Sequence, residues 1–391
     1  MAFQLTVNAV QRIHQGNRLV TLDDFTETFQ IQAVEDGSRI SLQDPQGDFV
    51  AKALVGRQNK GFAWVFTINQ GEAWSPEFIE DRLAIAFEKR TRLDTTQTTA
   101  YRLFNGEGDG IGAMTLDNYA GFVQINWYSR GIYAYRHWIV DALLAVRPQV
   151  KGIYETKRFI TEDGESAIEH TWGQAAPQPL HILENGISYA IYLGQDWMTG
   201  LFLDQREVRQ FVQMQAEGMS VLNLFSYTGG FSVAAAVGGA TQTVSVDVAN
   251  RSLDRTQEQF ALNGIQTPSE EHEIRVMDVF DYVNYARRHD KTFNLIVCDP
   301  PSFARTKKIT FSAEKDYANL ADQLFACLAP GGFLILSTNH SAYYKEQFMA
   351  DMVEVASQHG GQLIQSFDMP IDFPTSQDPM SAYLKVLVFY R

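Results

Sequence analysis

The chain is poor in cysteine, with two among its 391 residues. Two cysteines cannot build a disulfide framework, and no group of cysteines and histidines has the spacing of a metal site. Long hydrophobic runs are also absent, because no stretch approaches the roughly 18 apolar residues of a membrane-spanning helix. The opening stretch MAFQLTVNAVQRIHQG lacks the apolar centre of a secretory signal. These absences predict a cytoplasmic protein without a metal and without a membrane anchor.

Positive charge is scarce. Lysine and arginine number 32 against 46 aspartates and glutamates, which gives a formal net charge of −14. Because non-specific affinity for nucleic acids comes mainly from Lys and Arg on phosphates, the chain as a whole should repel a polyanion, although a local basic stripe would be sufficient for binding. Basic residues gather at 88–92, 287–288 and 304–308. For the first two segments we favour a solvated helix face; the third directly follows the sequence DPPSF.

The length and an apolar fraction of 45% predict two or three domains with substantial cores. Residues 1–75 alternate apolar and polar residues in short runs, which predicts a small β domain. An amphipathic helix is expected at 76–95, within an α+β region that extends to 185 and ends after a candidate linker at 173–180. From 186 to 391 the pattern changes to strand, turn and helix.

Near-continuous apolar runs in this last region predict parallel strands that are covered on both faces. They are VLNLF (221–225), TVSVDV (243–248), NLIVCD (294–299) and FLILST (333–338). Strands of this kind alternating with helices indicate an α/β doubly wound domain.

Three of these strand ends carry residues suited to a nucleotide ligand, and such ligands bind at the carboxyl ends of parallel strands. Gly229 and Gly230 allow a ligand to approach the backbone and the next helix N-terminus. Asp247 could accept both ribose hydroxyls, and Asp278 could accept from an adenine amino group. Each residue alone could be a turn glycine or a helix-capping aspartate. Three such features on one sheet favour a ligand site, and the absence of G-x-G-x-x-G disfavours a dehydrogenase.

The stretch VLNLFSYTGGFSVAAAVGGA (221–240) resembles motif I of class I S-adenosylmethionine-dependent methyltransferases, in the branch of bacterial large-subunit rRNA enzymes related to the cytosine-5 methyltransferase I. RISLQDPQGDFVAKAL (39–54) resembles the PUA domain of that family. RLFNGEGDGIGAMTLDNY (102–119) and GLFLDQREVR (200–209) resemble its central-domain and DQR segments. The resemblance implies an α/β fold with a PUA-like RNA-binding domain (1–75), an α+β central domain (76–185) and a Rossmann-like methyltransferase domain (186–391).

The resemblance also implies S-adenosylmethionine as cofactor, together with a set of binding residues. The set comprises Asn223, Phe225, Tyr227, Thr228 and Gly229 around the methionine part, Asp247 at the ribose, Asp278 and Val279 at the adenine, and Asp299, Asp204 and Arg206 over the site. Arg206 would pair with the cofactor carboxylate or with an RNA phosphate. A plain helix N-terminus is the alternative for the segment around Asp204.

The DPPSF segment supplies candidate catalytic residues. Two prolines after Asp299 stiffen the loop that leaves the strand. Phe303 could stack on a flipped base, and the Asp299 carboxylate could accept from exocyclic amines. The alternative is an ordinary strand exit with a packed Phe. With Asn339, these residues make up the predicted catalytic set.

The nucleophilic cysteine of the resembled cytosine-5 enzymes is missing, because Thr338 occupies its position. Cys298 should point away from Asp299, since side chains alternate along a strand. Cys327 is expected in a helix core. We therefore predict methyl transfer without a cysteine nucleophile.

DPPSFARTKK (299–308) and LSTNHSAY (336–343) are more similar to the guanine-N7 half of the bifunctional large-subunit rRNA methyltransferase. Guanine N7 has a lone pair and no proton, so neither a thiol nor a general base is required. His340 is a weaker candidate base, and Tyr317 either covers the base or packs within a helix.

The sequence thus predicts an S-adenosylmethionine-dependent methyltransferase that acts on a base of RNA, with large-subunit rRNA as its partner. A homodimer is compatible with the sequence. Three alternatives stay open: a cytosine-5 enzyme despite Thr338, a non-catalytic RNA-binding protein that retains the cofactor fold, and a small-molecule methyltransferase. The acceptor atom is also left open.

Overall fold

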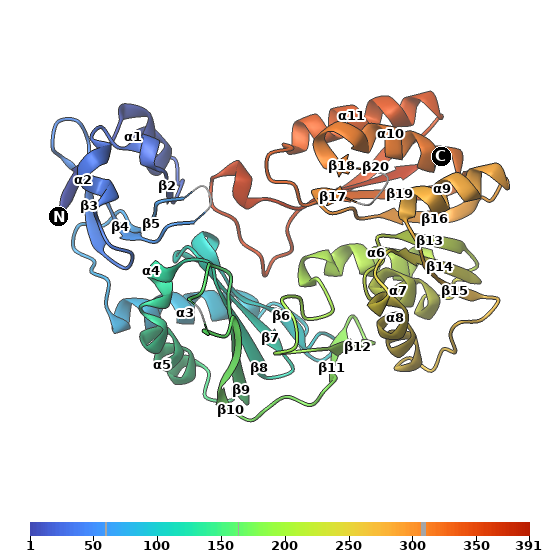
Figure 1. The fold of residues 1–391 in the computed structure, drawn as a ribbon, viewed down its shortest axis with the longest axis horizontal. Coiled ribbons are helices and arrows are strands. Elements are labelled where there is room, and N and C mark those ends of the chain that lie inside the picture. The colour runs from blue at the N-terminus through green and yellow to red at the C-terminus, as the bar shows by residue number, and fades with distance from the viewer. Residues whose placement is uncertain (59–60, 163, 306–309) are drawn as a thin grey trace. The chain divides into compact units, whose positions relative to one another are not determined.

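The computed structural model describes residues 1–58, 61–162, 164–305 and 310–391, which fall into two compact units (Figure 1). The first unit contains Met1–Ile182, Ile191–Thr199 and Ile371–Ser381. The second contains Leu183–Ala190, Gly200–Pro370 and Ala382–Arg391. The chain therefore returns to the first unit near its C-terminal end before it completes the second.

A five-stranded sheet in the order β1-β3-β4-β5-β2 opens the first unit. Its strands are β1 (Ala2–Gln4), β2 (Leu19–Val20), β3 (Arg39–Gln43), β4 (Phe49–Val55) and β5 (Ala63–Thr67), and they are joined by α1 (Val7–His14), the 3₁₀ turn η1 (Leu22–Asp24) and α2 (Thr28–Gln32). In β3, Ile40 and Leu42 are buried while Arg39 is exposed, the period-two pattern of a strand with one covered face. The predicted β-rich domain is present.

A second five-stranded sheet, β10-β9-β8-β7-β6, follows in the same unit. Its strands are β6 (Ala100–Asn105), β7 (Met114–Tyr119), β8 (Phe122–Trp127), β9 (Gly152–Lys157) and β10 (Ile168–Gly173); the accompanying helices are α3 (Pro76–Arg90), η2 (Gly106–Asp109), α4 (Arg130–Tyr133) and α5 (Arg136–Val146). Ser75 caps α3 by accepting from the Phe78 N–H at 3.2 Å, and Pro76 occupies the first helical position. Apolar residues of α3, α5 and the sheet share one core, as the predicted α+β region requires.

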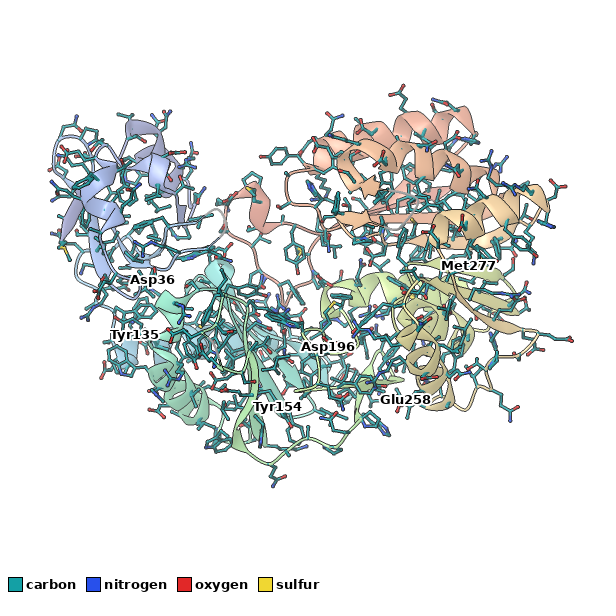
Figure 2. The ribbon with its side chains drawn as sticks, viewed as in Figure 1. Asp36, Tyr135, Tyr154, Asp196, Glu258 and Met277 are labelled. Carbon is teal, nitrogen blue, oxygen red and sulfur yellow. The ribbon has the colours of Figure 1, made fainter. Side chains whose placement is uncertain are left out.

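The two sheets of the first unit are joined by close backbone contacts near α4. The hydroxyl of Tyr135, labelled in Figure 2, donates to the Gly37 carbonyl at 2.8 Å. A Cβ added at Gly131 would lie 2.0 Å from the Val55 carbonyl oxygen, so only glycine allows β4 to approach this helix.

The second unit is built on a seven-stranded sheet in the order β15-β14-β13-β16-β19-β21-β20. Its strands are β13 (Ser220–Leu224), β14 (Gln242–Asp247), β15 (His272–Val276), β16 (Phe293–Cys298), β19 (Leu328–Thr338), β20 (Gln362–Phe367) and β21 (Lys385–Tyr390). The first five strands of that order are parallel, and β21 is antiparallel to both of its neighbours. This is the predicted doubly wound sheet, and its topological switch point lies between β13 and β16.

Helices cover both faces of this sheet (Figure 1). They are η3 (Leu203–Gln205), α6 (Arg206–Gln215), α7 (Gly230–Val237), α8 (Arg251–Ala261), α9 (Val279–Arg288), α10 (Ala313–Ala326) and α11 (Lys345–Gln358), with η4 (Pro379–Ser381) in the first unit. One apolar core lies under α9, α10 and α11, and another under α6 and α7. Two small ladders, β11 (Leu180–Glu184) with β12 (Ile187–Ile191) and β17 (Phe303–Arg305) with β18 (Thr310–Ser312), complete the fold.

The glycine-rich turn after β6 receives a segment from the far end of the chain. The Asn105 amide donates to the Pro374 carbonyl at 2.8 Å, and the Arg102 N–H donates to the Asp372 carboxylate at 2.9 Å. A Cβ at Gly108 would lie 1.8 Å from the Pro374 oxygen. Gly108 of the NGEGDG stretch thus permits backbone-to-backbone contact with this segment.

Arg90 corrects the interpretation of residues 88–92 as a solvated helix face. Its side chain is 2% exposed and forms a two-bond ion pair with the buried carboxylate of Asp109, at 2.9 and 2.6 Å. The remaining guanidinium N–H groups donate to the carbonyls of Ala86, Arg102 and Asp372. A buried carboxylate contributed by the glycine-rich turn draws this arginine inward. The arginines at 287–288 are exposed in the last turn of α9, as expected.

Replacing Arg90 with Met should lower the free energy of unfolding by about 3–5 kcal/mol, because the Asp109 carboxylate would stay buried without its main partner. Lys89 provides a matched control: it contacts the same carboxylate at 3.0 Å, but its side chain is 45% exposed. Lys89→Met should cost about 1 kcal/mol or less. Equilibrium urea unfolding of both variants measures the difference, and equal losses would contradict the buried-pair account.

Candidate active site

The carboxyl ends of four parallel strands meet at one edge of the seven-stranded sheet. In register, β13 pairs with β14 and β16, and β16 pairs with β19. Residues that follow these strands are therefore brought to one edge although the first, Phe225, and the last, Asn339, are 114 positions apart in sequence. Asp247 ends β14, Asp299 follows β16 and Asn339 follows β19. The structure thus brings the predicted cofactor and acceptor segments to the same edge of the sheet.

The turn after β13 has an unusual backbone. Phe225 and Tyr227 have φ values of +57° and +53°, in the left-handed region that non-glycine residues rarely adopt, and Gly229 has a φ of +77°. A Cβ at Gly229 would lie 2.5 Å from Thr256 Cγ2, so the turn is packed tightly against α8. The Thr228 hydroxyl fixes the turn by donating to the Gly200 carbonyl at 2.6 Å. The first N–H groups of α7 follow at once, an arrangement suited to an anionic group or a nucleotide.

Asn223 and Phe225 lie beside this turn in different environments. Asn223 is 1% exposed, and its amide donates to the Ser232 hydroxyl at 3.0 Å, which ties β13 to α7. The Phe225 ring lies in an aromatic group with Phe280 and Phe311, at centroid distances of 6.2 and 6.5 Å. Asn223 is therefore buried within the sheet, and its bond to Ser232 stabilises the turn between β13 and α7.

The two acidic residues predicted for the nucleoside both bind backbone N–H groups. Asp247 accepts from the N–H groups of Tyr227 and Ala249, each at 2.9 Å, and its carbonyl accepts from Met277, labelled in Figure 2. Asp278 caps α9 by accepting from Phe280 and Asp281 through one carboxylate oxygen. The capping geometry considered as an alternative is thus present at Asp278. The adjacent Val279 is buried in the first turn of α9.

Asp299 is half-buried at the point where β16 ends and the segment with the two prolines begins. The Ser337 hydroxyl donates to its carboxylate at 2.5 Å. Burial raises the pKa of Asp299 to about 6 from its ordinary value of 3.8; nearby Asp204 adds to this rise in the pKa, while hydrogen bonds from Ser337 and Gln205 oppose it. Ser337 could not be singled out from the sequence, because this contact depends on the alignment of β16 with β19.

The DQR segment, at the start of α6, faces the same carboxylate. Asp204 accepts from the Tyr383 hydroxyl at 2.8 Å, and Arg206 is 5% exposed. Arg209, which the sequence analysis did not single out, forms a buried ion pair with Glu184 at 2.6 and 2.8 Å. This pair holds α6 against β11 and so fixes the position of the DQR segment, which directly precedes and begins α6.

Neither cysteine is placed to act as a nucleophile. Cys298 is fully buried on the core side of β16, opposite Asp299, and burial raises the pKa of its thiol far above the ordinary value. Cys327 is buried at the end of α10, and burial raises its pKa as well. Thr338 is buried, with its hydroxyl accepting from the His340 N–H at 3.2 Å. Tyr317 is also fully buried, which favours helix packing over a role covering a base.

Phe303 and Asn339 are the exposed members of the predicted catalytic set. The Phe303 side chain is 61% exposed, so it is not the packed ring of an ordinary strand exit. The Ser302 hydroxyl donates to Asn339 Oδ1 at 2.7 Å and so links the DPPSF loop to the end of β19. Residues 306–309, which include the basic Lys307 and Lys308 of the ARTKK stretch, lie outside the described residues.

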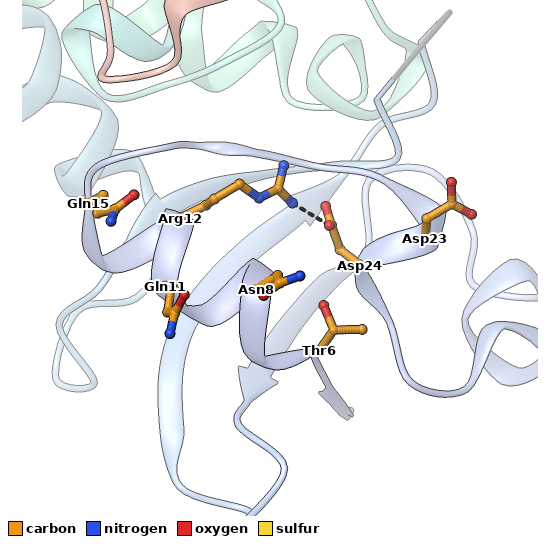
Figure 3. Close-up of a pocket in the computed structure, with 7 residues that line it drawn as sticks. All are labelled: Thr6, Asn8, Gln11, Arg12, Gln15, Asp23 and Asp24. Carbon is orange, nitrogen blue, oxygen red and sulfur yellow. Dashed lines mark hydrogen bonds and ion pairs between the residues drawn. The ribbon is translucent and has the colours of Figure 1, made fainter.

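The N-terminal sheet domain has a separate polar pocket (Figure 3). It is lined by Thr6, Asn8, Gln11, Arg12, Gln15, Asp23 and Asp24. Arg12 and Asp24 form an ion pair across it. In the part of the chain that the structure describes, no group of three His, Cys, Asp or Glu side chains could hold a metal, and no helix is long and apolar enough to cross a membrane.

Comparison with known families identifies both ends of the chain. Residues 156–390 match the family model described as S-adenosylmethionine-dependent methyltransferase, and residues 3–68 match that of a PUA-like domain. The confirmed fold class therefore comes with a confirmed cofactor, S-adenosylmethionine. The strained turn and the tight packing at Gly229, directly before the first turn of α7, fit such a group.

Known relatives cover nearly the whole chain. A Bacillus subtilis (strain 168) protein named "Putative ribosomal RNA large subunit methyltransferase YwbD" is 46% identical over 367 residues, 92% of each chain. The "Ribosomal RNA large subunit methyltransferase I" of Aeromonas salmonicida (strain A449) is 32% identical over 90% of each chain.

Two solved structures match along their full length. SMU.776, titled a putative methyltransferase complexed with SAH, is 37% identical with a TM-score of 0.91, and it covers 100% of both chains. A putative SAM-dependent methyltransferase from Streptococcus mutans is 36% identical with a TM-score of 0.90 over the same coverage. The chain belongs to the family of S-adenosylmethionine-dependent methyltransferases, in the group that has an N-terminal PUA-like domain and includes the large-subunit ribosomal RNA methyltransferases I.

Proposed function

We propose that this methyltransferase modifies a base of large-subunit ribosomal RNA. The observation that carries the proposal is the identity of 46% and 32% to two proteins named as large-subunit ribosomal RNA methyltransferases, each over at least nine-tenths of both chains. A PUA-like domain at residues 3–68 supports an RNA substrate over a small molecule.

The domain organisation that goes with this proposal has boundaries near residues 75 and 185. RNA would be held by the PUA-like and central domains and methylated by the Rossmann-like domain, in the cytoplasm. A homodimer is compatible with this arrangement. The charge of −14 requires that RNA binding be confined to local basic surfaces.

The acceptor, we further propose, is a base atom with a lone pair, such as guanine N7, and transfer proceeds in line without a cysteine nucleophile. The buried thiol of Cys298 and the Thr338 at the family cysteine position support this. S-adenosylmethionine supplies a methyl group on a sulfonium, so the protein mainly needs to align the acceptor. A cytosine-5 mechanism would require a thiolate at this edge of the sheet.

Each candidate residue has a task in this scheme. The turn at Tyr227 to Gly229 and the Asp247 carboxylate would orient the methionine and ribose parts of the cofactor. Phe303 would stack on the acceptor base, and Asn339 would hydrogen-bond to its edge. Asp299, when ionised, would accept from an exocyclic amine and so fix the rotation of the base.

Loss of the gene should remove one modified nucleoside from large-subunit rRNA, and we expect it to be 7-methylguanosine. Mass spectrometry of nucleosides from a deletion strain, its parent and a complemented strain measures this. Complementation with Asp299→Asn should not restore the nucleoside. Loss of 5-methylcytidine would refute transfer without a cysteine, and an unchanged nucleoside profile would refute an rRNA substrate.

Asp247→Ala should weaken S-adenosylmethionine binding at least tenfold in calorimetry, because it removes the ribose partner together with the acceptor for the Tyr227 N–H. Asp254→Ala is the control, since this aspartate is exposed on the neighbouring helix α8. Equal affinities of the two variants would exclude Asp247 from the cofactor site.

Methyl transfer should decline as the pH falls below about 6, where the Asp299 carboxylate takes up a proton.

The raised pKa of Asp299 also affects stability. In the unfolded chain this carboxyl group ionises near 3.8, so the folded protein binds one extra proton between pH 3.8 and about 6, and its stability falls as the pH rises through this window. Asp299→Asn removes that penalty. The variant should therefore unfold at a higher temperature than the parent at about pH 7.5. The difference between the two unfolding temperatures should be smaller at about pH 4.5. A difference in unfolding temperature that does not change with pH would contradict a raised pKa of Asp299.

A further inference from the structure

Lys385 is a buried lysine next to the catalytic edge of the sheet. It is the first residue of β21 and lies opposite Thr338, the last residue of β19. It is 3% exposed, and its ammonium donates to the His340 carbonyl at 2.7 Å. Among the described residues no carboxylate lies within ion-pair distance of it. Burial lowers the pKa of its ammonium to about 8.

A buried lysine without a counter-ion is unfavourable, and packing alone does not account for it. An apolar side chain such as Met would fill the same space between β19 and the core without the desolvation cost. The bond that the structure gives this ammonium is to the carbonyl of the turn immediately after β19, so its effect falls on that turn.

The turn held by Lys385 presents Asn339. The His340 carbonyl also accepts from the Tyr343 N–H at 3.0 Å, and the His340 N–H donates to Thr338 Oγ1. Asn339 lies at the exposed front of this turn, with its Oδ1 bound by the Ser302 hydroxyl. The bond from Ser302 to Oδ1 orients the Asn339 amide, whose N–H groups are its donors to a base.

We infer that Lys385 is a positioning residue for methyl transfer: it fixes the turn at 339–340 so that Asn339, tied to Ser302, meets the acceptor base in one orientation. The inference rests on the proposed function, since it concerns the same acceptor site. With a guanine acceptor, the partner of the Asn339 amide would be O6, the hydrogen-bond acceptor beside N7. The His340 carbonyl is shared by the Lys385 ammonium and the Tyr343 N–H, and the Tyr343 hydroxyl donates to Asp351 of α11.

The test compares activity with stability in the full-length protein. Lys385→Met should lower the rate constant for transfer to an unmodified large-subunit rRNA transcript at least tenfold. S-adenosylmethionine affinity should be unchanged and the unfolding temperature equal or higher. Lys385→Arg should restore part of the rate, because it still donates to the carbonyl. Val388→Ala, a buried truncation in the same strand, should lower the unfolding temperature and leave the rate of the folded protein unchanged.

A double-mutant cycle shows whether Lys385 acts through Asn339. If it does, Lys385→Met combined with Asn339→Ala should be no slower than the slower single variant. The inference would be overturned if the rate loss of the double variant equalled the product of the two single losses. A Lys385→Met variant with the parental rate would overturn it as well. So would a rate loss that merely follows a loss of stability.

Failure of the proposed function gives a different result. If the parent protein transfers no methyl group to the transcript, the function is wrong, but the role of Lys385 is still measurable by amide hydrogen exchange. Lys385→Met should speed exchange at His340 and Tyr343 in the protein without RNA. Unchanged exchange at both amides would overturn the positioning role.

Discussion

The parallel alignment of β13, β14, β16 and β19 is the constraint on which the catalytic domain depends. It brings the ends of four strands, distant in sequence, to one edge, and it forces each exit loop to provide one function. The turn after β13 is the most strained of these exits, with two non-glycine residues in the left-handed region. Its strain is offset by the Asp247 carboxylate, which binds the Tyr227 N–H, and by Thr228, which binds a carbonyl of the preceding segment. The residue proposed to hold ribose therefore also holds the turn in shape.

The proposed acceptor side of the edge is built from polar contacts instead of backbone strain. Asp299 receives a hydrogen bond from Ser337, Asn339 receives one from Ser302, and Lys385 holds the carbonyl of His340. These bonds join the exits of β16 and β19 to the start of β21. Thr338 stands where the resembled cytosine-5 enzymes have their nucleophilic cysteine, and the proposal of an acceptor atom with its own lone pair rests partly on this difference.

The sequence predicted structure correctly where a local pattern is typical of one kind of element or site. Continuous apolar runs predicted the parallel strands, and the NLFSYTGGF stretch predicted the cofactor and the fold. It was uninformative where the partner lies far away in the chain. Arg90 looked like part of a charged helix face because its partner Asp109 belongs to a turn that reads as a glycine-rich connection. Ser337 and Lys385 gave no signal, since their importance depends on strand register. For Tyr317 the sequence allowed both a base-covering role and helix packing, and its burial favours the second.

The segment that docks on the glycine-rich turn has a consequence for synthesis of the chain. Arg90 donates to the carbonyl of Asp372, a residue 282 positions later, and Asn105 donates to Pro374. The first unit therefore cannot complete its internal hydrogen bonds until nearly the whole polypeptide has left the ribosome. N-terminal domains usually fold first during translation, but here the first unit can reach only a partly bonded state. Its final consolidation must wait for residues 371–381, which are made just before β21.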